Sequence, residues 1–316
     1  MTMSVNRRAL WLVEALLAHA QERRVTLHLI EGGGRYIDCG IAARGGLLAG
    51  LELARVCLGD LAAVCIVPGE FAGRAVPLVQ VVTDHPVQAC LASQYAGWGI
   101  QEGKYFAMGS GPMRAVRGKE PVYDAIGCRE REPAVVGVLE ARKAPPPAVF
   151  AQVAGECGVE QAGVTLLAAP TASLAGGVQV VARSVETALH KLHALDFPMG
   201  RIQSAFGTAP LPPVARDDIS AIGRTNDAVL YGGRVILQVT GDDASLEEIG
   251  PKVPSSSSKD HGEPFAAIFA RYKNDFYAVD PHLFSPAEVV FQNLDTGRTH
   301  AFGRVEPEVL AGSFWS

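Results

Sequence analysis

Residues 164–195 read VTLLAAPTASLAGGVQVVARSVETALHKLHAL, a strand, a short turn and the longest helical pattern of the chain. The first seven residues are an apolar run of strand length, and apolar side chains then recur at helical spacing from Thr171 to Leu195. Outward from this stretch, short strand-like and helical patterns alternate along the rest of the chain. The alternation predicts an α/β or mixed α+β fold, with mixed sheets flanked by helices.

The rest of the chain contains two hairpin signals and one stretch of low complexity. Residues 25–41 alternate around Gly32–Gly34, and residues 286–305 alternate around Asp295–Gly297, as antiparallel hairpins do. Residues 85–97 show helical spacing, and residues 228–241 form two strands or one strand broken at its glycines. VPSSSSKDHGEP at 253–264 is predicted as a surface loop, because runs of Ser and Gly resist ordering.

Length and composition narrow the class of protein. The 316 residues suffice for two domains of about 150 residues each, and 48% of them are hydrophobic, so the chain can form a core. A net charge of −5 does not favour nucleic acid or a membrane surface as partner, because both require a concentrated basic surface. The six cysteines form no C-x-x-C motif, which favours reduced thiols and a cytoplasmic location.

The first twenty residues allow two interpretations. Arg7 and Arg8, an apolar run and Ala18–Ala20 imitate a secretory signal peptide with its cleavage site. However, Glu14 interrupts the run, and its apolar residues fall on one helical face that Asn6 can cap. We therefore expect an amphipathic first helix. No other segment reaches the ~18 apolar residues of a membrane span.

The 171–195 pattern also carries a row of polar side chains. Spacings of four, three and four place these residues on one helical face: Gln179, Arg183, Glu186 and His190. Such a row faces either solvent or a polar cavity, and buried charges need partners. Arg183 and Glu186 can form a solvent-facing ion pair, which spacing alone favours, or an active-site carboxylate held by an arginine.

Two turns have a composition suited to a ligand or to a helix start. The turn at 109–112 follows an apolar strand and can present N–H groups to an anion. Thr171 and Ser173 lie where a strand gives way to a helix, and capping is their favoured role. Metal motifs are incomplete, because the H-x-E at 261–263 lacks the cysteine motif of zinc deaminases.

Six strings resemble, in family order, the landmarks of methenyltetrahydromethanopterin cyclohydrolases: TDHPVQACLASQYAGW (83–98), KYFAMGSGP (104–112), APTASLAGGVQVVARSVETAL (169–189), TND (225–227), VPSSSSKDHGEPF (253–265) and DPHLFSPA (280–287). The resemblance extends from about residue 4 to the C-terminus. Two features depart from archaeal members. Serines occupy 255–258 where a cysteine is expected among them, and FGTAPLPP (206–213) replaces a more polar string.

The resemblance implies a fold, an assembly and a reaction. Residues 1–316 would form one cyclohydrolase unit of two closely packed α/β subdomains, with boundaries that can be discontinuous and a pterin-binding cleft between them. The subunits would form a homotrimer without metal or redox cofactor. The reaction would be reversible hydrolysis of 5,10-methenyltetrahydromethanopterin to the 5-formyl form in one-carbon metabolism, with formaldehyde oxidation in a methylotrophic bacterium as the preferred setting.

The resemblance also assigns residues. Arg183 and Glu186 match the catalytic R-x-x-E pair, and we expect Glu186 to act as base and then acid while Arg183 orients it. Predicted substrate contacts, each of which capping or turn formation explains equally well, are Gln94, Gly109, Ser110, Gly111, Thr171, Ser173 and Asp227. Two other classes stay open: a catalytically silent pterin- or nucleotide-binding module, and a metal-dependent amidohydrolase or deaminase.

Overall fold

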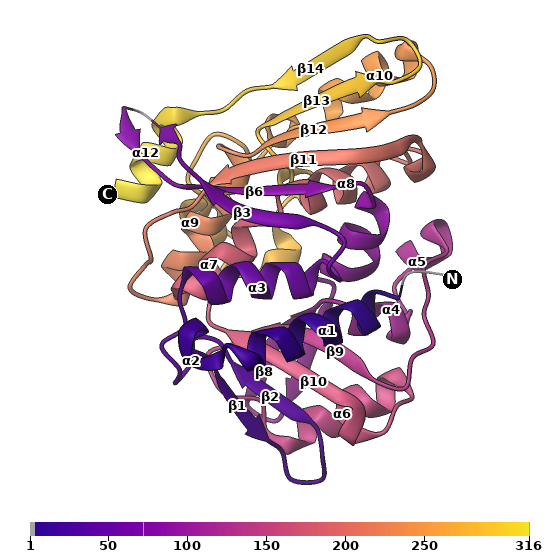
Figure 1. Cartoon of the computed structure of the whole chain (residues 1–316). Coiled ribbons are helices and arrows are strands. Elements are labelled where there is room, and N and C mark those ends of the chain that lie inside the picture. The colour runs from indigo at the N-terminus through magenta and orange to yellow at the C-terminus, as the bar shows by residue number, and fades with distance from the viewer. Residues whose placement is uncertain (1–3, 72, 316) are drawn as a thin grey trace. The chain divides into compact units, whose positions relative to one another are not determined.

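The computed structural model describes residues 4–71 and 73–315, which divide into two compact units (Figure 1). Within the described residues, unit 1 consists of 4–62 and 88–179, and unit 2 of 63–71, 73–87 and 180–315. Each unit contains a mixed sheet flanked by helices, so the predicted fold class is confirmed.

The strands described in unit 1 form a six-stranded sheet. Their order across the sheet is β1 (Thr26–Leu29), β2 (Arg35–Asp38), β10 (Val164–Ala169), β9 (Val135–Glu140), β8 (Tyr105–Ser110) and β7 (Trp98–Glu102). The central strands β2, β10 and β9 are parallel, and the outer pairings are antiparallel. The parallel strand β10 is buried along its whole length, as expected for a strand covered on both faces.

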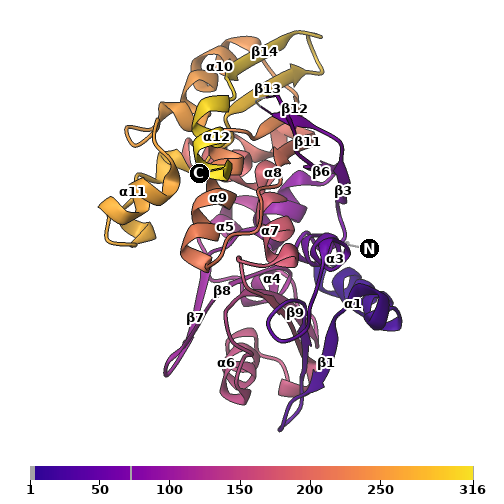
Figure 2. The same cartoon turned by 90° about the vertical axis from the view of Figure 1, so that its left-hand side faces the viewer.

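Helices cover both faces of this sheet. Because side chains alternate along a strand, Leu166 and Leu167 of β10 enter different cores. Leu167 packs with α1 (Val5–Ala18) and α3 (Leu47–Cys57), and Leu166 packs with α6 (Pro147–Cys157). Figure 2 shows α1 and α6 on opposite sides of the sheet. The other helices of unit 1 or at its boundaries are α2 (Ala20–Arg23), η1 (Val87–Gln94), α4 (Met113–Arg117), α5 (Val122–Ile126), η2 (Gln161–Gly163) and α7 (Leu174–Val181).

The main sheet described in unit 2 also has six strands. Their order is β14 (Thr299–Gly303), β13 (Glu288–Asn293), β12 (Arg234–Val239), β11 (Ile202–Pro210), β6 (Leu78–Thr83) and β3 (Ala63–Val67). Only the β12–β13 pairing among these is parallel. A small hairpin, β4 (Glu70–Phe71) and β5 (Arg74–Ala75), follows β3.

Helices α8 (Ser184–Ala194) and α9 (Asp218–Leu230) pack directly on this sheet, and the short helix η4 (Gly250–Lys252) contacts its edge strand β14. Helix α8 lies on β11 and β12, and α9 lies against β11. Helices α11 (Phe265–Arg271) and α12 (Pro307–Trp315) pack on α9. The remaining helices are α10 (Asp243–Ile249), η3 (Met199–Arg201), η5 (Ser255–Ser257), η6 (Phe276–Ala278) and η7 (Pro281–Leu283).

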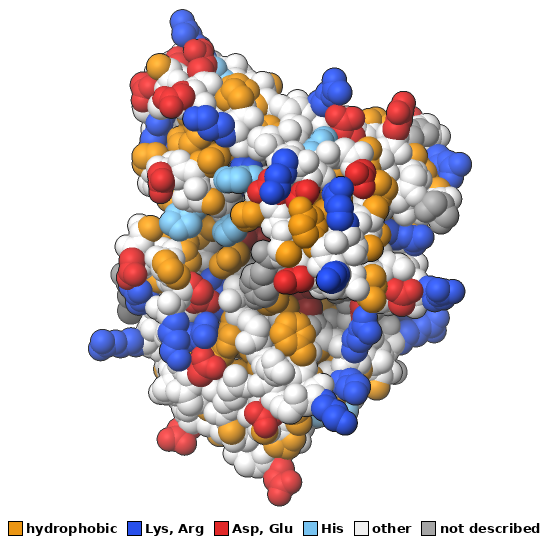
Figure 3. Space-filling view, turned by 180° about the vertical axis from the view of Figure 1, so that it is seen from behind, with side chains coloured by type: hydrophobic (Ala, Val, Ile, Leu, Met, Phe, Trp, Pro, Cys, Tyr) orange, Lys and Arg blue, Asp and Glu red, His pale blue; other side chains and the backbone are white. Residues whose placement is uncertain are grey.

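Surface composition agrees with the mild net charge. On the face seen in Figure 3, acidic and basic side chains are interspersed with apolar ones. Among the described residues, the helices are all too short or too polar to cross a bilayer.

Both predicted hairpins are confirmed, as β1–β2 and β13–β14. The amphipathic first helix is confirmed as α1, whose apolar side enters the core of unit 1. Its predicted cap is wrong, because the Ser4 hydroxyl accepts the hydrogen bond from the Arg7 amide. Asn6 is buried instead, where it donates to the Pro112 carbonyl and accepts from the Val136 amide.

Four predicted elements differ from the structure. The helix expected at 171–195 is divided into α7 and α8 by a break at Ala182–Arg183. The helix expected at 85–97 is the π-helix η1. Residues 228–230 end α9, so only β12 remains of the strands expected at 228–241. The loop expected at 253–264 is largely ordered, because Ser255, Ser258 and Asp260 are buried and hydrogen-bonded.

Candidate functional site

The residues at the start of α8 are the first candidates. Arg183 precedes the helix with φ −88° and ψ 7°, a sparsely populated region in which active-site residues are often found. Glu186 lies in the first helical turn, where the helix dipole favours a carboxylate. Arg183 is 7% exposed and Glu186 5% exposed. The solvent-facing ion pair that spacing favoured is therefore wrong, and both charges lie in the interior.

A glycine lets this first turn approach the sheet. Gly207 lies on β11, and a Cβ added there would lie 2.7 Å from both Ser184 Oγ and Val185 Cγ2. Real Cβ atoms essentially never show contacts this short, so a larger residue would force these side chains, or the strand and helix that carry them, to shift. Gly207 thus sets the position of the turn that carries Glu186.

The predicted polar row does not continue along one helix. Gln179 belongs to α7 and to unit 1, whereas Arg183, Glu186 and His190 belong to unit 2. Gln179 is buried, and its Nε2 lies 3.7 Å from Cys57 Sγ. The helix break separates Gln179 from the other three.

Cys57 connects several predicted contacts in unit 1. Its Sγ lies 3.2 Å from Ser110 Oγ and 3.9 Å from the Gln94 carbonyl oxygen. Its carbonyl accepts a 2.6 Å hydrogen bond from Ser93 Oγ. Gln94 and Ser110, 16 residues apart in sequence, are thus brought together around one buried thiol. Sequence reasoning missed Cys57, because it resembled any apolar residue at a helix end.

The turn after β8 is held by hydrogen bonds to neighbouring elements of unit 1. Gly111 has φ +92°, which favours glycine, and its N–H donates to the Ser93 carbonyl at 2.8 Å. Ser110 Oγ donates to the Val138 carbonyl at 3.3 Å. Gly109 pairs with Trp98 across β7 and β8. These contacts explain the turn structurally, and its contact with a substrate stays a prediction.

Ser173 has the capping role that was favoured for it. Its hydroxyl accepts from the Gly176 amide at 3.0 Å and donates to the Pro170 carbonyl at 2.7 Å. Thr171 lies in the same turn and is buried. Both lie between the carboxyl end of β10 and α7, where ligands often bind in α/β folds.

Asp227 is buried inside unit 2. Its carboxylate accepts from the Phe265 amide at 2.7 Å and from Ser313 Oγ at 2.6 Å, which ties α9 to α11 and α12. Burial raises its pKa to about 7, and the two hydrogen bonds offset part of that rise. Its contact with substrate also stays a prediction.

The predicted residues fall into two groups by unit. Unit 1 contains Gln94, Gly109, Ser110, Gly111, Thr171 and Ser173. Unit 2 contains Arg183, Glu186 and Asp227. Within residues 4–71 and 73–315, no three His, Cys, Asp or Glu side chains are grouped as metal ligands.

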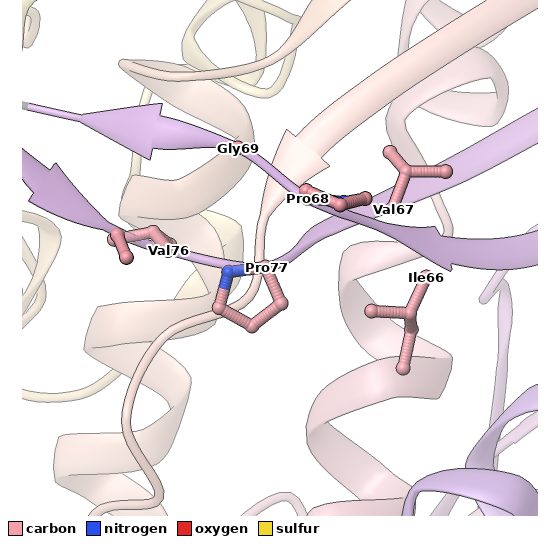
Figure 4. Close-up of a pocket in the computed structure, with 7 residues that line it drawn as sticks. Ile66, Val67, Pro68, Gly69, Val76 and Pro77 are labelled. Carbon is pink, nitrogen blue, oxygen red and sulfur yellow. The ribbon is translucent and has the colours of Figure 1, made fainter.

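One pocket of unit 2 contains none of these residues. It has a volume of about 390 Å³ and lies beside the β4–β5 hairpin (Figure 4). Its lining is apolar: Ile66, Val67, Pro68, Gly69, Ala75, Val76 and Pro77. It offers no acid, base or nucleophile among these side chains.

Comparison with known proteins agrees along nearly the whole chain. A family model described as Cyclohydrolase (MCH) matches residues 4–314. A protein of Rhodopirellula baltica, named methenyltetrahydromethanopterin cyclohydrolase, is 50% identical over 92% of this chain and 88% of its own. Proteins of the same name from Methylobacterium sp. (strain 4-46) and Methanococcoides burtonii are 46% and 40% identical, over 98% and 99% of this chain and 97% and 98% of theirs. Taken with the full-length match, these identities show that the chain belongs to the cyclohydrolase (MCH) family.

Proposed function

We propose that this protein is an enzyme that hydrolyses 5,10-methenyltetrahydromethanopterin to the 5-formyl form. Family membership and relatives at 40–50% identity with that name support the proposal. The structural observation that supports assigning the reaction to particular residues is that Arg183 and Glu186 are both buried at the start of α8. The comparisons support neither a silent binding module nor a metal-dependent deaminase.

The chemistry needs few groups. The substrate contains an N–CH=N cation whose carbon is already electrophilic. Water adds to that carbon, and one carbon–nitrogen bond then breaks. Of the two water protons, one ends on the departing nitrogen and the other is released, so cation and water give a neutral formyl product. The enzyme must accept a proton, deliver one and hold the reactants in place.

We assign these tasks to the pair on α8. A buried carboxylate stabilises a bound cation and can take a proton from water, so Glu186 would act as base and then as acid. Arg183, three residues before it, would orient Glu186 and balance its charge, so that the pair is near neutral before the cation binds. The proposed contacts to the pterin or its tail are Gln94, Thr171, Ser173, Asp227 and the 109–111 turn.

The wider assignments follow from the family and remain proposals. The protein would act as a homotrimer in the cytoplasm, without metal or redox cofactor. Its setting would be one-carbon metabolism, with formaldehyde oxidation in a methylotroph. Relatives of that name from Methylobacterium and Methylobacillus support that setting. A relative of the same name from Methanococcoides burtonii neither adds to that support nor opposes it.

Loss of the methenyl chromophore tests the function and the base together. We expect the wild type to turn over equally with and without chelator, and Glu186→Gln to lower kcat by ~10²–10⁴ because it keeps the shape but lacks the base. Glu248→Gln, an exposed change on α10, is the matched control. No turnover by the wild type would contradict the function. A Glu186→Gln kcat within a few-fold of wild type would contradict only the assignment of the base.

A further inference from the structure

A buried lysine lies on the same helix as the proposed catalytic pair. Lys191 of α8 is 2% exposed. Its ammonium donates to the His282 carbonyl at 2.6 Å and to Ser257 Oγ at 3.1 Å. All three residues belong to unit 2. One side chain of the helix therefore contacts two points that are 25 residues apart in sequence.

Both points belong to one compact segment, residues 253–286, which we call the strap. Its polar core is Asp260, which accepts from Tyr272 Oη at 3.0 Å and from the Asp280 amide at 3.0 Å. Asp280 in turn accepts from Ser258 Oγ at 2.7 Å. Four rings pack together in it: Phe265, Phe269, Phe276 and Phe284. The strap is thus held in shape by its own contacts.

Helix α9 holds the middle of the strap. Asp227 accepts from the Phe265 amide, while Tyr231 Oη donates to the Glu263 carbonyl at 2.5 Å and accepts from the Gly262 amide at 3.1 Å. Lys191 supplies the corresponding bonds from α8, to the early part of the strap at Ser257 and to the late part at His282. The two helices therefore hold different parts of the strap.

The charge of Lys191 is energetically unfavourable at this position, because the side chain is buried. Removing an ammonium from water costs free energy, and an apolar side chain of the same length would avoid that cost. Burial lowers the Lys191 pKa to about 8, against the opposing effect of the Asp280 carboxylate. An apolar side chain has no hydrogen-bond donor, whereas the Lys191 ammonium bonds Ser257 and His282 at once.

We infer that Lys191 is a positioning residue of the proposed hydrolysis, fixing the strap to α8 and thereby holding the first turn of α8, with Glu186, in its working orientation. The inference rests on the proposed function. It also rests on two contacts of one helix: Gly207 seats the amino end of α8 on β11, and Lys191 fixes its second half. Helix α8 also packs on β11 and β12, so loss of either contact removes one restraint on its orientation and not its packing as a whole. Small misplacements of catalytic groups are costly in rate.

The test replaces the ammonium and then restores it. We expect Lys191→Met to lower kcat by ~10-fold or more while KM changes by less than ~3-fold, because orientation and not substrate contact is lost. Lys191→Arg, which keeps charge and donors, should recover most of that kcat. Lys252→Met makes the same substitution at an exposed lysine of η4 and should match the wild type. Circular dichroism and melting curves confirm that each variant is folded at the assay temperature.

The outcomes separate this inference from the function. A folded Lys191→Met with wild-type kcat overturns it, even if the melting temperature has dropped. If that variant does not fold, Ser257→Ala removes one acceptor and should still lower kcat by ~2–10-fold, corresponding to about one hydrogen bond. Wild-type kcat in Ser257→Ala then overturns the inference. Absence of turnover in the wild type contradicts the proposed function instead.

Discussion

The carboxyl group of Asp227 shows how one buried acid can make stability depend on pH. Its pKa is raised to about 7 in the folded protein by burial. An unfolded aspartate titrates near 3.9, so from about pH 4 to 7 the folded state binds more protons. The stabilisation from this group is complete below about pH 4 and is lost as pH rises towards 7.

Asp227→Asn should remove that dependence. The amide oxygen can accept from the Phe265 amide, and the amide nitrogen can donate to Ser313 Oγ, so the links to α11 and α12 remain. Urea unfolding at pH 5 and pH 8 should show the variant gaining stability relative to wild type at the higher pH. Exposed Glu248→Gln is the control. An equal difference at both pH values would contradict the buried, protonated carboxyl, and an unchanged KM would remove Asp227 from the predicted substrate contacts.

Sequence alone identified Asp227 as a candidate residue but did not show its structural role. In the string TND it looked like a polar contact to substrate. Its partners lie 38 and 86 residues further along the chain, on helices that pack against α9 only in the folded unit. The same holds for Glu186 and Arg183, whose spacing allowed an exposed pair. Burial is a property of the tertiary structure, and no local pattern reports it.

At the scale of elements, the packing of α8 on β11 is set by Gly207. Gly207→Ala should cost about 1–3 kcal/mol by overpacking, because its Cβ would overlap Ser184 and Val185. It should also lower kcat, since the first turn carries Glu186. Gly155→Ala in α6 is the matched control: an added Cβ there meets no described atom within 4 Å, and alanine favours a helix. Wild-type kcat with normal stability in Gly207→Ala would contradict this account of the turn.

The π-helix η1 depends on a buried arginine. Arg114 Nη1 donates to the carbonyls of Leu91 and Ser93 at 3.2 and 3.4 Å, while Tyr123 Oη donates to the Ala92 carbonyl at 2.7 Å. Three consecutive carbonyls at the end of η1 are satisfied in this way. Such helix ends need partners, and the next residue is Gln94, a predicted substrate contact.

Arg114→Lys should therefore weaken both stability and substrate binding. Lysine keeps the charge but lacks the fork that bonds two carbonyls, so we expect a loss of about 3 kcal/mol or more and a raised KM. Tyr123→Phe, which removes a single hydrogen bond, should cost only about 1 kcal/mol. Urea unfolding and steady-state kinetics measure the two effects. If KM is unchanged in a destabilised Arg114→Lys, Gln94 does not depend on this end of η1.

Elements whose structure is specified by residues within the element were predictable from the sequence. Elements whose structure depends on contacts with distant parts of the chain were not. Positive φ at Gly32, Gly33, Gly34 and Gly297 matches the turns of the two predicted hairpins. The helix break at Ala182–Arg183 contains neither Gly nor Pro, and the helical spacing of apolar residues continues across it. The sequence therefore contains no local signal of the break. The serine run looked disordered because its order comes from Leu230 and Asp280, which bond Ser255 and Ser258 from elsewhere in the chain.

At the scale of the whole molecule, segments of the two units alternate along the chain. Residues 63–87 contribute β3 and β6 to the sheet of unit 2, while the chain on both sides belongs to unit 1. Strand β6 pairs with β11, more than 100 residues later. A pattern of strands and helices predicts the class of such a fold, but its pairing depends on contacts that no local signal records.

The proposed homotrimer is a prediction at this scale. Large apolar side chains are exposed on the single chain: Trp11 at 65%, Leu29 at 79% and Phe106 at 59%. Apolar and aromatic side chains are common in the cores of subunit interfaces, so these three are candidates for positions that a partner subunit covers. The trimer proposed from the family resemblance predicts sedimentation at three times the 33.4 kDa of the chain, with little change over a wide range of micromolar concentrations.

Three single variants probe which of these side chains lies between subunits. A charge placed in an apolar interface costs several kcal/mol, so at least one of Trp11→Glu, Leu29→Glu and Phe106→Glu should sediment at a lower mass. Glu248→Lys, a charge change at an exposed acid, should leave the mass unaltered. A wild-type mass of one chain at all concentrations would contradict the trimer. A trimer unaffected by all three variants would mean that its contacts are formed by other surfaces, and these apolar side chains would then face solvent in the assembled enzyme.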